Sequence, residues 1–203
     1  MHFQIHFKGT IPFDVNLLRN GSGELETEEQ QLNGANRNSE DFDEYFYKNW
    51  KTLSSGGLGW KLYRSESHYE NYFATSYISC TKLQVIDLLE IGLSPELMDR
   101  YQPHIYVEDT YSKCRDHGAV YELYTSIGDQ RWPGTPIVEH KVRHDMTRDD
   151  DDGWRTVRHE FSNYGSGIRF INVLHGGCCE DMDEGWFGVK VKNTKVVIKY
   201  PQN

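Results

Sequence analysis

Two short segments combine cysteine and histidine at a spacing that structural zinc sites use. Cys114 lies three residues before His117, and His175 lies three residues before Cys178. A set of four Cys and His ligands is what a structural zinc ion needs. The two pairs fall near the ends of different predicted strands, however, and nothing in the sequence brings them together. We therefore interpret them as separate loop residues and small buried thiols, and we expect neither a metal site nor a cofactor.

Other chemistries find less support in the sequence. The acidic run before Gly153 suggests calcium, but the alternating acids and the closing glutamate of an EF-hand loop are absent. Ser166 lies between two glycines without the strand-to-helix turn that exposes a serine nucleophile. Cys178 near His175 is a conceivable nucleophile and base, but neighbours on a strand end seldom reach the required geometry. We expect no catalytic residue, and hence no enzyme.

The elements that must position these residues are short strands separated by turns. Apolar and polar positions alternate in several segments, as where Phe187, Val189 and Val191 share one face. Turn-forming residues lie between the segments and include Gly176-Gly177, which we interpret as a turn. The predicted strands are residues 3–7, 60–63, 72–77, 83–88, 105–109, 119–127, 137–142, 155–161, 167–175, 187–191 and 195–200.

This pattern predicts an all-β fold, built as an antiparallel β-sandwich or barrel. A short connecting helix is predicted at 95–101, with Ser94 as its N-cap, Pro95 at its first position and Pro103 after its end. No predicted helix is long enough for a βαβ crossover, which excludes an open parallel sheet. The length of 203 residues fits one domain spanning 1–203.

Acidic residues concentrate in two places. The formal net charge is −9; residues 24–44 hold eight acids and one base, and residues 145–152 hold five acids and one base. The first stretch lacks periodicity, so we predict an acidic, flexible insertion at about 24–44. No basic stripe is present to neutralise phosphates, and no apolar run approaches the ~20 residues of a bilayer helix. We expect no nucleic-acid or membrane partner, and the four cysteines indicate a reduced, cytoplasmic setting.

Eight motifs, in order along the chain, resemble the F-box-associated (FBA) domain family. They are NLLRN at 16–20, YFATS at 72–76, QVIDL at 84–88, QPHI at 102–105, VYEL at 120–123, YGSGIRF at 164–170, HGG at 175–177 and GWFG at 185–188. The layout is most similar to the stand-alone nonspecific cytotoxic cell receptor-type members, and it resembles the sugar-binding domain of glycoprotein-recognising F-box proteins. The resemblance implies a jelly-roll-like, galactose-binding-domain-like antiparallel β-sandwich of about ten strands with no catalysis.

The resemblance also implies a function. Family members act as substrate adaptors that hold N-glycosylated, often misfolded, proteins for a cullin-type ubiquitin ligase, as in endoplasmic-reticulum-associated degradation. They grip the inner chitobiose through loops at one end of the sandwich. Only about fifteen residues precede the start of the resemblance, so we expect no F-box here and ubiquitin-ligase components engaged in trans.

The glycan-gripping loops differ from the family pattern. Met182, Asp183 and Glu184 stand where glycan-binding members present a tyrosine, a tryptophan and a lysine. In the shortened loop at 64–70, His68 or Tyr69 would substitute for the phenylalanine of the family.

We therefore expect a non-enzymatic recognition module that binds a glycoprotein or protein ligand through loops at one end of the sandwich. The candidate ligand-binding residues are His68, Tyr69, Asp109, Tyr111, Arg115, Asp116, Met182, Asp183 and Glu184. The alternative is a structural or assembly interaction protein that has lost chitobiose binding. The altered loop and the acidic insertion favour that alternative.

Overall fold

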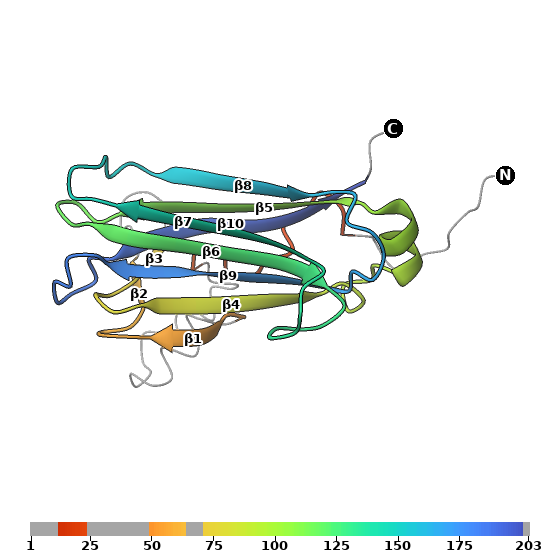
Figure 1. Ribbon diagram of the computed structural model, residues 1–203, viewed down its shortest axis with the longest axis horizontal. Coiled ribbons are helices and arrows are strands. Elements are labelled where there is room, and N and C mark those ends of the chain that lie inside the picture. Colours follow the sequence, from red (N-terminus) through yellow and green to blue (C-terminus); the bar gives the residue numbers. More distant parts are fainter. Residues whose placement is uncertain (1–11, 24–48, 64–70, 201–203) are drawn as a thin grey trace, which may run out of the picture.

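The computed structural model describes residues 12–23, 49–63 and 71–200, and these residues form two antiparallel sheets packed face to face (Figure 1). One sheet has the order β1-β4-β9-β6-β7 and the other β2-β3-β10-β5-β8. The strands are β1 Lys51–Ser55, β2 Lys61–Tyr63, β3 Tyr72–Ala74, β4 Cys80–Asp87, β5 His104–Lys113, β6 Ala119–Gly128, β7 Val138–Met146, β8 Arg155–Phe161, β9 Phe170–Cys179 and β10 Val189–Lys199. The predicted all-β sandwich of about ten strands is confirmed.

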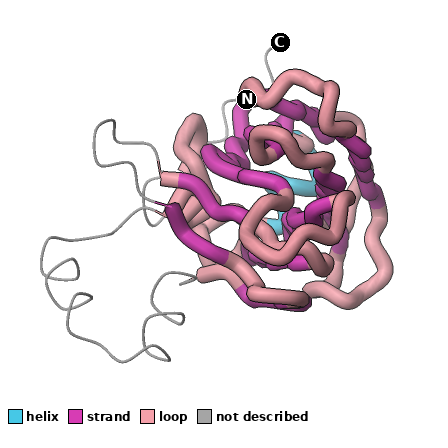
Figure 2. Tube along the Cα trace, turned by 90° about the vertical axis from the view of Figure 1, so that its left-hand side faces the viewer, coloured by secondary structure: helices cyan, strands magenta, loops and turns pink. Residues whose placement is uncertain are grey.

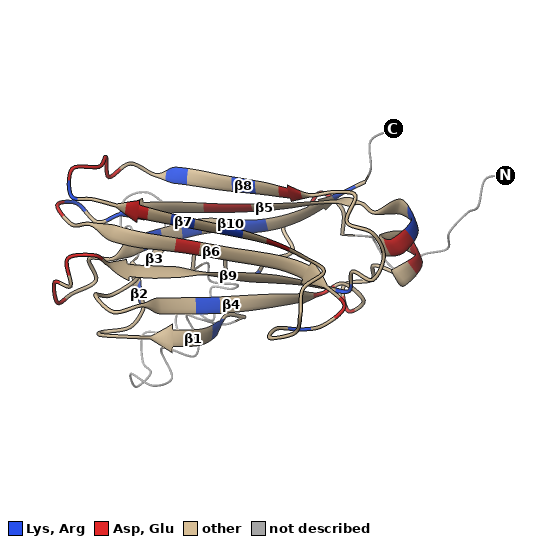
Figure 3. Cartoon of the chain, in the orientation of Figure 1, with Lys and Arg blue, Asp and Glu red and all other residues tan. Residues whose placement is uncertain are grey.

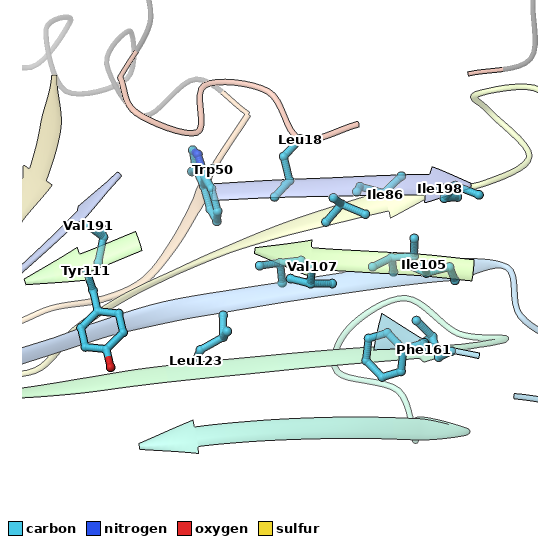
Figure 4. Close-up of a cluster of buried hydrophobic side chains, with 14 of the residues drawn as sticks. Leu18, Trp50, Ile86, Ile105, Val107, Tyr111, Leu123, Phe161, Val191 and Ile198 are labelled. Carbon is cyan, nitrogen blue, oxygen red and sulfur yellow. The ribbon is translucent and has the colours of Figure 1, made fainter. Parts of the chain in front are cut away.

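The inner faces of the two sheets supply the core. Along β10, Val189 and Val191 are fully buried and alternate with lysines, as the period-two pattern predicts. β7 and β8 are the last strands of their sheets, and their exposed and half-buried residues alternate in the same way. Figure 4 shows side chains from both sheets meeting between the layers, among them Ile86, Ile105, Val107, Leu123, Phe161 and Ile198, together with Leu18 and Trp50 from the chain before β1.

The predicted short helix is present as η1 (Leu97–Tyr101), a π-helical turn between β4 and β5. The Leu97 N–H donates a 3.2 Å hydrogen bond to Ser94 Oγ, so Ser94 caps the turn as predicted. The helix ends where Gln102 takes a left-handed conformation, one residue before Pro103. No helix within the described residues is long and apolar enough to cross a membrane.

Three local predictions were wrong. β1 was not predicted, because its sequence is polar and most of its residues are exposed. The predicted strands at 187–191 and 195–200 form one strand, β10, whose register with β5 shifts between Lys192 and Lys195. Gly176 and Gly177 form no turn, because they lie inside β9 and pair with β4 and β6. The predicted strand at 3–7 and the predicted insertion at about 24–44 lie outside the described residues.

Candidate ligand-binding end

Five loops gather at one end of the sandwich, on the left in Figure 1 and facing the viewer in Figure 2. They connect β1 to β2, β3 to β4, β5 to β6, β7 to β8 and β9 to β10, and span residues 56–60, 75–79, 114–118, 147–154 and 180–188. We call this set the loop end. The sequence prediction placed the binding loops at one end of the sandwich, and the loop end contains two of the segments it named.

Backbone hydrogen bonds join the β5–β6 loop to the β9–β10 loop. The Glu180 N–H donates to the Gly118 carbonyl at 2.9 Å, and the Gly118 N–H donates to Asp181 Oδ2 at 2.7 Å. The His117 ring stacks on Phe187 with ring centroids 4.3 Å apart. The structure therefore brings the predicted residues of these two loops to the same end of the molecule.

The predicted residues of these two loops are exposed. Met182 is 61% exposed and, like Asp116, has a positive φ angle. Arg115, Asp183 and Glu184 are also exposed. Such side chains can contact a ligand without any rearrangement of the core.

Charges at the loop end are paired across three loops. Arg148 Nε lies 3.0 Å from Asp181 Oδ2, and its Nη2 atom lies 3.5 Å from Asp183 Oδ2. The Gly118 N–H, together with Arg148, lowers the pKa of Asp181. The buried Lys113 ammonium donates to the carbonyls of Arg148 at 3.0 Å and His117 at 3.4 Å. Acidic residues colour the tips of these loops in Figure 3.

Two predicted residues lie in the interior instead. Asp109 is fully buried between the sheets, where it accepts hydrogen bonds from Tyr121 at 2.7 Å and Thr194 at 2.8 Å. Tyr111 is 7% exposed, stacks on Tyr121 and bonds His144 Nδ1 through its hydroxyl at 2.9 Å. Both residues lie on the inward face of β5, so neither reaches the rim. His68 and Tyr69 lie outside the described residues.

The two cysteine–histidine pairs do not meet. His175 is fully buried, stacks on Trp50 and bonds Asp109 at 2.8 Å, whereas His117 lies in the β5–β6 loop. Burial lowers the pKa of His175, partly offset by the neighbouring Asp109 carboxylate, and burial raises the pKa of the Cys178 thiol. His175 faces the interior, whereas Cys178, three residues further along β9, lies on the other face of the strand, so the two side chains do not form a nucleophile–base pair.

Sequence reasoning missed an array of aromatic rings beside the loop end. Trp154 contacts Tyr72 with centroids 5.8 Å apart, and Tyr72 stacks on Tyr63 at 5.1 Å. The Lys61 ammonium lies 4.8 Å from the Tyr63 ring and 4.2 Å from the Trp186 ring, so it continues the array. We call Trp154, Tyr72, Tyr63, Lys61 and Trp186 the aromatic strip.

The aromatic strip lies on the outward face of β2 and β3. The inward residue Phe73 is fully buried, and Tyr72 therefore points to the other side. Trp154 is 38% exposed, and the ammonium groups of Lys190 and Lys192 lie 5.3 and 4.1 Å from its ring. The strip thus joins one exposed ring, Trp154, to half-buried rings and to lysine ammonium groups.

A separate groove of about 510 Å³ lies over β5, β8 and β10. Its charged side chains neutralise one another. Glu108 pairs with Arg158 at 2.7 Å and with Lys195 at 3.4 Å. Two lining residues also pack between the sheets: Val107 in the core, and His159 on His140. None of the predicted ligand-binding residues that the structure describes lines this groove.

Comparison with known proteins gives consistent matches. The family described as "F-box associated region" matches residues 10–198. F-box only protein 2 of Bos taurus is 32% identical over 194 residues, covering 91% of this chain and 59% of that protein. F-box only protein 44 of Homo sapiens is 33% identical over 169 residues, covering 75% of this chain and 63% of that protein. The chain thus spans about three fifths of the length of these curated relatives.

Among solved structures, one match is that of TmCBM61 in complex with beta-1,4-galactotriose. It covers 92% of this chain and all of that one, with 12% sequence identity and a TM-score of 0.49.

Proposed function

Because the chain belongs to the F-box-associated family, we propose that it is a non-enzymatic recognition module that binds glycoproteins at the loop end. The observation that carries the proposal is the aromatic strip. Aromatic rings contribute large contact area at low entropic cost, and their faces suit the apolar faces of sugar rings. Lysines beside the rings can donate hydrogen bonds to sugar hydroxyls and to acetamido carbonyls.

The aromatic strip supports glycan binding despite the altered β9–β10 loop. Met182, Asp183 and Glu184 offer no ring, but Trp186 follows two residues later and joins the strip through Lys61. Stacking surface is therefore present beside the loop rather than at its tip. The exposed Met182 and Glu184 would then contact the polypeptide that carries the glycan.

We further propose that a bound glycoprotein is presented to ubiquitin-ligase components engaged in trans. The family membership supports this role, as do the relatives named F-box only proteins. All four cysteines are free, which fits a reducing compartment such as the cytoplasm.

A glycan array and calorimetry with chitobiose test the proposal. We expect the purified chain to bind N-glycan core structures, and Trp154→Ala to weaken binding by about fivefold or more, since a stacked ring contributes roughly 1 kcal/mol or more. Trp132→Ala is the matched control, because this tryptophan lies in the β6–β7 loop and packs on Tyr124, outside the strip. A silent array and no glycoprotein in pull-downs would remove glycan from the proposal.

The second candidate is an assembly protein without glycan binding. It is favoured by the engagement of Asp183, which lies 3.1 Å from His117 Nδ1 and 3.5 Å from Arg148 Nη2. It predicts that deleting residues 24–43 abolishes partner capture while substitutions at 182–184 leave it unchanged. The reverse result supports recognition through the loop end.

A further inference from the structure

Three potential metal ligands converge where β9 ends. His117, Cys179 and Asp181 each offer one ligand atom, and these atoms all lie within 4.8 Å of one another. Asp183 adds a fourth, because its Oδ2 atom lies 3.1 Å from His117 Nδ1. The set combines the β5–β6 loop with the end of β9 and the start of the β9–β10 loop.

His117 presents a nitrogen to the two carboxylates. Stacking on Phe187, with the ring planes 4° apart, fixes the orientation of the imidazole. The Nδ1 atom is shielded from solvent and lies 3.1 Å from Asp183 Oδ2 and 4.0 Å from Asp181 Oδ2, but it forms no hydrogen bond with a described residue. A nitrogen that faces carboxylate oxygens in this way can coordinate an ion held between them.

Cys179 presents a buried sulfur to this cluster. The residue is 1% exposed at the end of β9, and its sulfur lies within 4.8 Å of the ligand atoms of His117 and Asp181. Cysteine sulfur is a preferred ligand of zinc.

The two carboxylates are held by other parts of the loop end. Asp181 Oδ2 accepts from the Gly118 N–H at 2.7 Å and from Arg148 Nε at 3.0 Å. Ligating carboxylates in metal sites are commonly hydrogen-bonded in the same way. With the thiolate and both carboxylates ionised, the ligand set carries three negative charges, which a divalent cation and Arg148 together would neutralise.

We propose that His117, Cys179, Asp181 and Asp183 bind one zinc ion. Zinc accepts nitrogen, sulfur and carboxylate ligands in tetrahedral sites, whereas calcium and magnesium take oxygen ligands. Bond lengths of about 2.0–2.3 Å give ligand separations of roughly 3.3–3.8 Å. The ligand atoms of His117, Cys179 and Asp181, which lie within 4.8 Å of one another, would therefore close by up to about 1 Å on binding. Four protein ligands leave no open coordination position, and the ion acts as a structural link between the two loops.

The ligands that the structure brings together differ from the cysteine–histidine pairs that the sequence spacing suggested. The Cys-x-x-His pairs point to Cys114 and Cys178, but side chains alternate along β9, and Cys179 rather than Cys178 lies buried next to His117. The zinc site does not depend on glycan binding, so the two proposals can fail separately.

Zinc affinity of the purified 203-residue chain, measured by competition with a chromophoric chelator, tests the proposal. We expect one equivalent of Zn²⁺ and, with Co²⁺ as probe, a thiolate-to-cobalt charge-transfer band. Cys179→Ser should abolish the band. Loss of a group that only orients a metal ligand weakens metal binding by about 10- to 100-fold. Because Asp183 is proposed as a ligand itself, Asp183→Asn should weaken zinc binding by more than that. Cys178→Ser and Cys114→Ser are matched controls that keep both signals.

Thermal unfolding supplies a second readout. Zn²⁺ should raise the Tm of the wild-type chain, because a ligand that binds only the folded state stabilises it. The rise should be lost in Asp183→Asn, whose exposed side chain can change without disturbing the core. Two results would overturn the proposal: a folded wild-type chain that takes up no Zn²⁺ under competition, or Cys179→Ser and Asp183→Asn variants that take up as much Zn²⁺ as the wild type. Either result would leave the carboxylates as ion-pair partners of Arg148.

Discussion

The Thr194 hydroxyl donates a 2.8 Å hydrogen bond to Asp109 Oδ1, and both side chains are fully buried. Thr194 lies in the register shift of β10, between Lys192 and Lys195, and its partner is the inward-facing acid of β5. The other carboxylate oxygen of Asp109 bonds Tyr121 on β6 and His175 on β9. A single acid therefore links strands of both sheets.

Replacing Asp109 should destabilise the fold rather than a binding surface. Asp109→Ala leaves the buried donors of Tyr121 and His175 without an acceptor and Thr194 with only the Gly21 carbonyl at 3.4 Å. We expect a loss of about 3–5 kcal/mol in the free energy of unfolding. Urea denaturation followed by circular dichroism measures it. Thr194→Val removes one of these donors and should cost only about 1 kcal/mol. Equal midpoints for wild type and Asp109→Ala would contradict this role.

The stacked histidines of β7 and β8 should make stability depend on pH. The rings of His140 and His159 are 3.7 Å apart, and burial lowers the pKa of both; the His140 charge lowers that of His159 further, against the opposing effect of Glu160. A histidine pKa below its unfolded value means that the unfolded chain binds protons first. Stability is therefore full above about pH 6.5 and falls as the pH drops through that value toward the folded pKa values.

The wild-type Tm at pH 7.5 and pH 5 measures this decline. His140→Phe keeps a ring against His159 and removes one titrating group, so its Tm should fall less between the two pH values. An equal fall in Tm between pH 7.5 and pH 5 for the two proteins would argue against the stacked histidines as the source of the pH dependence.

Period-two alternation in the sequence predicts much of the buried core. The predictions that failed have physical causes. Ile105, Val107, Asp109 and Tyr111 occupy alternate positions of β5, so the pattern already indicated that Asp109 and Tyr111 face inward. Asp109 was interpreted as a rim residue from the family pattern and its place at the end of the predicted strand 105–109. The partners that hold it inside lie 12, 66 and 85 positions away, where the local sequence does not reveal them.

The aromatic strip could not be predicted from the sequence, because its residues also lie far apart along the chain. Tyr63 and Tyr72 meet because β2 and β3 pair in one register, and Trp154 joins them from a loop far along the chain. Local propensity does not specify which strands become neighbours. The loop end itself was predictable, because turn-forming residues marked where the strands stop.

Breaking the ion pair of Asp99 and Arg169 should loosen η1. The guanidinium bonds both carboxylate oxygens, at 2.8 and 2.7 Å, and the Gly167 N–H adds a third hydrogen bond. Hydrogen bonding by Arg169 and the Gly167 N–H lowers the pKa of Asp99 to about 2. The unfolded carboxyl titrates near 3.8, so the stabilisation is full above about pH 4 and is lost as the pH falls through about 2.

Asp99→Asn tests this contribution. Since both side chains are partly solvated, we expect a loss of about 1 kcal/mol at pH 7. The difference between wild type and variant should shrink as acid protonates Asp99, and unfolding curves between pH 7 and pH 2 would reveal it. A difference that stays constant over that range would assign the effect to packing instead of charge.

Gly176 should tolerate no side chain, because an added Cβ atom would collide with the neighbouring strand. Its backbone conformation is not the reason. A Cβ atom there would lie 1.9 Å from the Cys80 carbonyl oxygen on β4, because β9 runs closely between β4 and β6. Gly176→Ala must push apart two paired strands, and we expect a loss of about 3 kcal/mol or more in urea denaturation. Gly92→Ala is the matched comparison, since Gly92 has a φ of +90° but no atom within 4 Å of the added methyl. Its cost should be only the backbone strain of about 1–2 kcal/mol. If Gly92→Ala proved the more damaging of the two, the close approach of β9 to β4 would not be what requires glycine.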